Sequence, residues 1–315
     1  MESGVNKLSK KLDIKGIIPP VVTLINKDKT LDEQAMAHHI DNLIENRVNG
    51  LFFMGTGGEF AQMSVALRKQ TAEVAVRETA GRVPVLIGTG AAGYEETKEL
   101  SLHAEEIGAD AIVVINPYYW NVSEDHLFSY YKSLAEEVNL PIILYNFPGT
   151  TGQDLTPDFV SKLAEEIPSI IGVKETVDEA GHIREMIIKT KEVRSDFIVL
   201  SGYDDHLLNT LTLGGDGAIS AGVNFAPELQ VGIYEAFQKN DFETAIQLHR
   251  QNAYIPLMYK LDTPFVNVIK EAMILRGKNI EPYVFGPGDV LGEHQRQELK
   301  NLMKLANISA KMLSR

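Results

Sequence analysis

Short apolar runs alternate with longer amphipathic segments along most of the chain. The runs are rich in β-branched residues, whereas the segments between them repeat their apolar positions at helical spacing. The strand candidates lie at residues 16–23, 48–54, 84–88, 109–115, 141–146, 170–175, 197–202 and 217–221. A helical pattern follows each of them, so the sequence predicts eight β/α units.

The strand candidates are almost continuously apolar, as in AIVVI at residues 111–115 and PIILY at residues 141–145. Parallel strands covered by helices show this pattern, and eight such units favour a closed barrel over an open sheet. A doubly wound sheet is the alternative, but the GxGxxG signature that commonly follows its first strand is absent. The sequence therefore predicts an α/β fold built on a (β/α)8 TIM barrel.

The strand pattern ends near residue 240. Three helical patterns follow, at residues 241–259, 263–276 and 293–312, and predict a C-terminal three-helix appendage. We therefore expect an N-terminal extension at residues 1–12, a catalytic barrel at residues 13–240 and the appendage at residues 241–315. A chain of 315 residues accommodates a barrel of ~250 residues together with an appendage.

Charge and cysteine content narrow the function. The formal net charge is -13, and no run rich in lysine, arginine and aromatics offsets it, which argues against nucleic acid as a partner. The absence of cysteine excludes disulfides, thiolate zinc sites and a cysteine nucleophile. The sequence starts without a signal-peptide pattern and contains no run of ~18 apolar residues, so we expect a cytoplasmic protein with no membrane partner.

The residues that close the strands carry the candidate chemistry, because the active site of such a barrel lies at the C-terminal ends of its strands. Lys174 is the only lysine in the C-terminal part of a predicted strand. Partial burial there would disfavour the ammonium form and supply a neutral amine to attack a ketone. Tyr145 closes the neighbouring strand, within reach for proton transfer, and Thr56 and Tyr119 could extend a hydroxyl relay. The alternative is a lysine that extends to solvent beside tyrosines that only pack.

Gly55-Thr56-Gly57-Gly58 follows the second strand candidate and is too short for a Walker A loop. Its backbone N–H groups could form a nest for a carboxylate, which an acidic protein needs in order to bind an anion. The alternative is a tight turn in which the glycines adopt positive φ.

Metal catalysis is disfavoured, because none of the eight histidines closes a strand candidate. Asp204-Asp205-His206 is the one cluster that combines carboxylates with an imidazole, and we interpret it as a helix start. We expect neither a metal nor a separate cofactor, since the Lys174 amine can itself form a covalent bond to a ketone.

These residues resemble the dihydrodipicolinate synthase and N-acetylneuraminate lyase superfamily of pyruvate-dependent class I aldolases over essentially the whole chain. The motifs that carry the resemblance are GTGGE at residues 55–59, NPYY at 116–119, YNFP at 145–148, GVKET at 172–176 and GGDGAIS at 214–220. The resemblance implies that Lys174 is the Schiff-base lysine and Tyr145 the proton shuttle, with Thr56 and Tyr119 as relay partners.

The resemblance also implies a substrate site. The amides of Thr56 and Gly57 would bind a carboxylate, and Gly202 and Ile219 would line the lysine pocket. Family members commonly form homotetramers, with Tyr119 reaching across a subunit interface. The implied partners are pyruvate, a small-molecule keto acid, and an aldehyde.

Thr150 and Gly57 depart from the dihydrodipicolinate synthases. Where those enzymes have an arginine that binds the carboxylate of the second substrate, this chain has Thr150, and Gly57 replaces the second threonine of their GTTGE motif. A charge-assisted hydrogen bond is worth ~1.5–3 kcal/mol, so its loss disfavours a dianionic partner.

The segments GTGGEF, INPYYW and LDTPFVNVIKEA most closely resemble the branch that cleaves 2-keto-3-deoxy sugar acids of the gluconate, galactonate or pentonate type. We therefore expect a sugar-acid aldolase in which Thr150 and Thr151, with Tyr203 or Asp204, meet the hydroxyl groups of the aldehyde. A dihydrodipicolinate synthase and a barrel that senses pyruvate without turnover are the alternatives.

Overall fold

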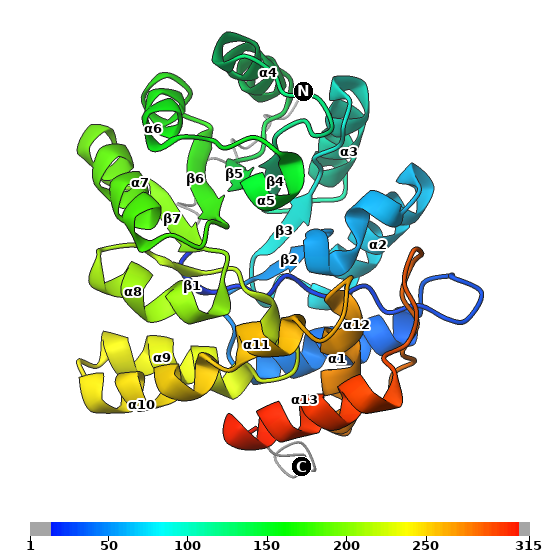
Figure 1. Ribbon diagram of the computed structural model, residues 1–315. Helices are drawn as coiled ribbons and strands as arrows, with labels where there is room; N and C mark the ends of the chain where they lie inside the picture. The colour runs from blue at the N-terminus through cyan, green and yellow to red at the C-terminus, as the bar shows by residue number, and fades with distance from the viewer. Residues whose placement is uncertain (1–13, 309–315) are drawn as a thin grey trace.

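The computed structural model describes residues 14–308, which form an eight-stranded parallel barrel ringed by helices (Figure 1). The strands are β1 Gly16–Ile17, β2 Leu51–Phe53, β3 Val85–Gly88, β4 Ala111–Ile115, β5 Ile142–Asn146, β6 Ile170–Glu175, β7 Ile198–Ser201 and β8 Gly217–Ala218. They pair in the order β1-β8-β7-β6-β5-β4-β3-β2, and a parallel bridge between Pro20 and Phe52 joins the two ends. The predicted (β/α)8 barrel is confirmed, whereas the N-terminal extension at residues 1–12 lies outside the described residues.

Several strands are shorter than their apolar runs, and β1 shows the reason. It covers only two residues of the run at 16–23, because Pro19 and Pro20 have no N–H to continue a regular ladder. The run nevertheless stays bonded to β2, since Phe52 N donates to Pro19 O at 3.0 Å and Val21 N donates to Phe52 O at 2.8 Å. The barrel therefore closes through an irregular segment.

Helices follow the strands in turn and form the outer layer (Figure 1). They are α1 Glu33–Glu45, α2 Val65–Thr79, α3 Tyr94–Glu106, α4 Glu124–Glu137, α6 Pro157–Glu166, α7 Ala180–Val193, α8 Leu207–Thr212 and α9 Pro227–Gln238, with the short α5 Pro148–Thr151 between β5 and α6. Side chains cap several N-termini: Asp32 Oδ1 accepts from Ala35 N at 2.9 Å, and Ser64 Oγ accepts from Leu67 N at 3.2 Å. Among the described residues, no helix has the length and apolar character needed to cross a membrane.

The C-terminal helices are α10 Phe242–Asn252, α11 Ile255–Tyr259, α12 Val266–Leu275 and α13 Glu293–Leu305. The first of the three predicted helices is thus two, because Pro256 is tolerated in the first turn of α11 but would break a continuous helix. Helix α10 packs on α9, and α11 and α12 contact the 3-10 helices that follow β7 and β8, η4 Asp204–His206 and η5 Ala221–Asn224. The appendage therefore borders the C-terminal mouth of the barrel. A domain boundary at residue 240 stays a prediction.

Candidate active site

Lys174 and Tyr145 lie side by side at the C-terminal end of the barrel. Each is the last residue but one of its strand, and their Cα atoms are partners in the β5–β6 ladder. Lys174 Nζ lies 3.8 Å from the centre of the Tyr145 ring and 5.3 Å from the centre of the Phe52 ring. The amine therefore faces aromatic surfaces inside the mouth of the barrel.

Lys174 is only 4% exposed, and this burial changes the protonation of its amine. Burial lowers the pKa of its ammonium group to about 7, against an opposing effect of the Asp204 carboxylate. Near neutral pH such an amine is uncharged in a far larger share of molecules than an exposed lysine. This lysine can act as a nucleophile without a separate base to deprotonate it.

The Tyr145 hydroxyl is held by Thr56. The Tyr145 hydroxyl oxygen lies 2.9 Å from Thr56 Oγ1, while the Tyr145 ring meets Phe52 edge-on and stacks on Phe147. Burial raises the pKa of the phenol to about 12, so it stays protonated near neutral pH. A protonated phenol beside a neutral amine can supply a proton to a leaving hydroxyl group and later recover it.

The glycine-rich loop after β2 presents free N–H groups. Residues 56–58 form the 3-10 helix η2 Thr56–Gly58, and the amides of Thr56 and Gly57 donate to no backbone acceptor among the described residues. Positive φ occurs at Glu59 (61°) but at none of the loop's glycines, so the alternative reading of a turn built on glycines of positive φ is wrong. Glycine is needed at position 55 because the backbone there packs closely against the Phe52 ring, and a Cβ would lie 2.7 Å from it. The two amides are available to an anion.

A buried ion pair ties this loop to the appendage. Glu59 Oε2 lies 2.8 Å from Lys270 Nζ of α12, and Glu59 Oε1 accepts from Phe285 N at 2.7 Å. Lys270 Nζ also donates to Tyr283 O at 2.7 Å. Both charges are therefore neutralised and hydrogen-bonded, as burial requires.

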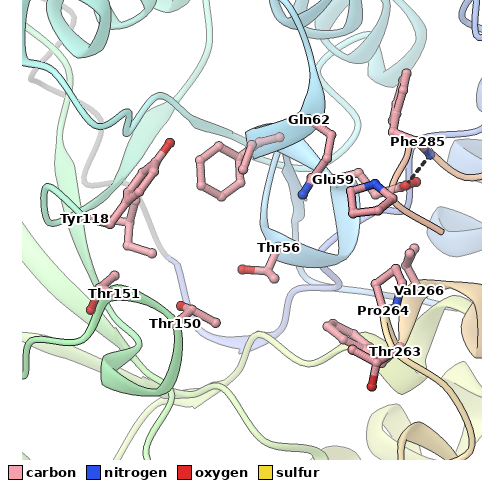
Figure 2. A pocket seen from close by; sticks show the side chains of 15 residues that line it. Thr56, Glu59, Gln62, Tyr118, Thr150, Thr151, Thr263, Pro264, Val266 and Phe285 are labelled. Carbon is pink, nitrogen blue, oxygen red and sulfur yellow. Dashed lines mark hydrogen bonds between the residues drawn. The ribbon is translucent and has the colours of Figure 1, made fainter.

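A cavity of about 500 Å³ lies between the barrel mouth and the appendage (Figure 2). Its barrel side includes Thr56, Tyr118, Thr150 and Thr151, and its appendage side includes residues 263–266 and Phe285. Thr56 belongs both to the cavity wall and to the hydrogen-bonded pair with Tyr145. The cavity therefore meets the Lys174 and Tyr145 pair at the Thr56 hydroxyl.

Thr150 and Thr151 line this cavity, as expected for residues that meet the aldehyde. The Thr150 hydroxyl donates to Phe147 O at 3.1 Å and so remains mainly as an acceptor. Thr151 Oγ1 lies 2.9 Å from Gln153 O and 3.2 Å from Phe147 O, and it accepts from Gln153 N at 3.3 Å. Asp204 is placed differently: it is 2% exposed, and its carboxylate accepts from Gly222 N, Gln230 Nε2 and the Tyr259 hydroxyl at 2.7–2.9 Å. Asp204 is thus bonded to protein groups rather than presented to the cavity.

The remaining predicted residues take different positions. Tyr119 is 91% exposed and does not reach Tyr145 within this chain. Gly202 follows β7, and a Cβ there would lie 2.0 Å from Thr176 Oγ1, so only glycine fits. Ile219 is fully buried directly after β8. The structure brings Lys174, Tyr145 and Thr56 together but leaves Tyr119 at the surface.

Sequence reasoning missed a partly buried polar cluster at the ends of β5 and β6. Asn146 Nδ2 lies 2.9 Å from Glu175 Oε1 and 2.7 Å from Asp154 Oδ1, and His182 Nε2 lies 3.1 Å from Asp154 Oδ2. The available signal was a polar residue directly after Tyr145 and another directly after Lys174. In the part of the chain that the structure describes, no group of three or more His, Asp or Glu side chains is arranged to hold a metal ion.

Comparison with known proteins gives consistent results. Residues 13–306 match the dihydrodipicolinate synthetase family. The chain is 51% identical to the "Putative 2-dehydro-3-deoxy-D-gluconate aldolase YagE" of Escherichia coli K12, over 92% of this chain and 96% of YagE. It is 52% identical to the "Probable 2-dehydro-3-deoxy-D-pentonate aldolase YjhH" of the same organism, over 86% of this chain and 90% of YjhH.

Solved structures agree. The crystal structure of YagE in complex with pyruvate has a TM-score of 0.92 and 50% identity, and the match covers 93% of this chain and 99% of that one. A dihydrodipicolinate synthase from Thermotoga maritima has a TM-score of 0.89 at 30% identity, over 93% of this chain and 99% of that one. The fold is therefore shared with proteins named for two different activities, and YagE has the higher identity of the two.

Proposed function

The chain belongs to the dihydrodipicolinate synthetase family, and we propose that within it the protein is a Schiff-base aldolase. Its substrate is a 2-keto-3-deoxy sugar acid of the gluconate, galactonate or pentonate type, which it cleaves to pyruvate and a hydroxyaldehyde. The observation that carries the proposal is the pairing of a buried Lys174 amine with a protonated Tyr145 phenol. The distance from Lys174 Nζ to the centre of the Tyr145 ring is 3.8 Å. Identities of 51% and 52% to two proteins named as deoxy sugar acid aldolases support the substrate class.

The reaction begins at Lys174. Its neutral amine adds to the C2 ketone, and Tyr145 passes a proton to the new C2 hydroxyl group, which leaves as water. Meanwhile the amides of Thr56 and Gly57 hold the substrate carboxylate. The product of these steps is an iminium ion on Lys174 that can accept an electron pair.

Cleavage then uses the iminium as the electron sink. When the C4 hydroxyl loses its proton, to the Tyr145 oxygen or to the substrate carboxylate, the C3–C4 bond breaks and the hydroxyaldehyde departs. The electron pair of that bond forms the enamine of pyruvate. Protonation at C3 and addition of water release pyruvate and restore the amine, so no separate cofactor takes part.

The cavity wall favours a neutral aldehyde over an aldehyde that carries a second carboxylate. Of the described residues that line the cavity, none is lysine or arginine, and the Glu59 carboxylate is already paired with Lys270. Thr150 stands where dihydrodipicolinate synthases have their carboxylate-binding arginine. A second carboxylate would therefore lose its water without gaining a cation.

The relay is completed by a second subunit. Tyr119 is 91% exposed with φ of 82°, and the adjacent Trp120 is 76% exposed. Large exposed aromatics beside an active site suit a subunit interface. We place Tyr119 across that interface, close to the Thr56 and Tyr145 pair of a neighbouring subunit in a homotetramer.

A substrate panel tests the proposed function. We expect 2-keto-3-deoxygluconate or 2-keto-3-deoxypentonate to be cleaved with kcat/KM at least ~100-fold above condensation of pyruvate with aspartate semialdehyde, a gap of ~2.7 kcal/mol. Equal or reversed efficiencies would identify a dihydrodipicolinate synthase. Imine formation with pyruvate but no cleavage of any sugar acid would identify a pyruvate sensor.

A further inference from the structure

We infer that Asn146, Asp154, Glu175 and His182, here called the strand-end cluster, position Lys174 and Tyr145 for the reaction. They tie the ends of β5 and β6 to each other and to the first turn of α7. The inference rests on the proposed function, because it assigns these residues a role in the Schiff-base chemistry of Lys174. None of the four touches the substrate in this account.

The first observation is the place of the cluster in the strands. Asn146 and Glu175 are partners in the β5–β6 ladder, one residue beyond the partners Tyr145 and Lys174. Successive residues of a strand point to opposite faces, so Asn146 and Glu175 lie on the outer side when the reacting pair lies inside. The bond between Asn146 Nδ2 and Glu175 Oε1, 2.9 Å long, therefore joins the two strand ends behind the reacting side chains.

The second observation is that the Asn146 side chain is saturated. Its Nδ2 also donates to Asp154 Oδ1 at 2.7 Å, and its Oδ1 accepts from Leu155 N at 3.0 Å. Because Asp154 Oδ1 and Glu175 Oε1 act as acceptors and Leu155 N needs an acceptor, only one orientation of the amide satisfies all three partners. Asn146 is thus held rigidly and transmits its position to Tyr145.

The third observation is the connection to α7. His182 Nε2 lies 3.1 Å from Asp154 Oδ2, and His182 Nδ1 lies 3.7 Å from Glu175 Oε1. The hydrogen bond to Asp154 raises the pKa of His182, and burial raises the pKa of Glu175 to about 8. The Glu175 carboxyl is therefore largely protonated near neutral pH, which limits the charge buried next to the Lys174 amine.

Packing alone gives little reason for a carboxyl group at position 175. Glu175 is fully buried, and its Oε2 has no hydrogen-bond partner among the described residues. A buried polar atom without a partner lowers stability, and an apolar side chain of similar volume usually does not. The hydrogen bond that Glu175 Oε1 accepts from Asn146 explains a carboxyl group here better than a gain in stability does.

The expected effect is on turnover rather than on binding. A displacement of ~1 Å in a reacting group can cost about 100-fold in rate. The carboxylate-binding amides of Thr56 and Gly57 belong to the loop after β2, not to β5 or β6. A loosened strand-end cluster should therefore separate amine from phenol while leaving the carboxylate site in place.

The test compares Glu175→Leu, which removes the acceptor for Asn146, with Glu175→Gln, whose amide oxygen keeps it. For each, the rate of imine formation with pyruvate is measured by borohydride quenching, together with kcat and KM for the sugar acid. Asp216→Asn is the control, because Asp216 is likewise a buried carboxyl that joins neighbouring elements, its Oδ2 accepting from Lys191 Nζ and Val199 N, but it lies just before β8 at the opposite end of the barrel. Glu175→Asp, which withdraws the acceptor by one methylene, replaces Glu175→Leu if the leucine variant does not fold.

We expect Glu175→Leu or Glu175→Asp to slow imine formation and kcat by at least ~10-fold with KM within about threefold of wild type. Glu175→Gln and Asp216→Asn should keep both rates within about threefold. Wild-type rates in a folded leucine or aspartate variant would overturn the inference, as would equal losses in the glutamine variant. Failure of the wild-type protein itself to form an imine would instead refute the proposed function, so the two failures are distinguishable.

Discussion

Replacing Tyr145 by phenylalanine tests whether the phenol moves protons in the reaction. The change deletes the hydroxyl group that lies 2.9 Å from Thr56 Oγ1 and leaves the ring between Phe52 and Phe147. A positioned proton donor contributes ~10²–10⁴-fold to a rate. We therefore expect kcat for cleavage of a deoxy sugar acid to fall at least ~100-fold, which corresponds to ~2.7 kcal/mol of transition-state stabilisation.

The fold should survive this change, because loss of one such hydrogen bond costs only ~1 kcal/mol. Tyr131→Phe is the matched control: Tyr131 is fully buried in α4, and its hydroxyl has no hydrogen-bond partner among the described residues. Its turnover should equal that of the wild type. Pyruvate release measured for all three proteins decides the matter, and wild-type turnover in Tyr145→Phe, or equal losses in both variants, would refute the assigned role.

Three further changes follow from the site. Lys174→Met should abolish turnover yet raise stability, because a pKa lowered from 10.5 to about 7 in the folded state imposes a penalty that is full below pH 7 and gone above pH 10.5. The gain in the free energy of unfolding, up to ~5 kcal/mol, should therefore be largest below pH 7. Equal urea midpoints of the variant and the wild type in that range would contradict the lowered pKa of Lys174. Thr150→Arg should weaken sugar-acid cleavage and improve use of aspartate semialdehyde; unchanged kcat/KM for both would remove Thr150 from the substrate site. Lys270→Met should lower the free energy of unfolding by ~3–5 kcal/mol because it leaves the Glu59 charge without its partner, and a second change, Glu59→Gln, should recover part of this loss. If the losses of the two single variants simply add in the double variant, measured by urea unfolding, the two residues are not coupled.

The barrel and the meeting of Lys174 with Tyr145 could be predicted because both rest on local patterns. Apolar runs of similar length alternate with helical segments, and residues at the same place in neighbouring parallel strands meet at one edge. The ladder partners Tyr145 and Lys174 are the direct outcome. Assignment of chemical roles to these residues stays a proposal.

Other features depend on partners that are distant in the sequence. Glu59 and Lys270 are 211 residues apart, and nothing local to either residue indicates the other. The strand-end cluster combines two strand ends with a loop carboxylate and a helical histidine, so its members share no periodicity. Positive φ falls at Glu59 rather than at a neighbouring glycine, and Gly55 is required instead for its close approach to the Phe52 ring, a contact that the local sequence does not indicate.

The central claim is that Lys174 forms a covalent imine with the keto acid. Incubation of the active protein with pyruvate and borohydride, followed by peptide mass spectrometry, tests it most directly. The account predicts that the mass of reduced pyruvate is added at Lys174 with parallel loss of cleavage activity. An unmodified Lys174 in protein that still cleaves the sugar acid, or modification at another lysine, would contradict it.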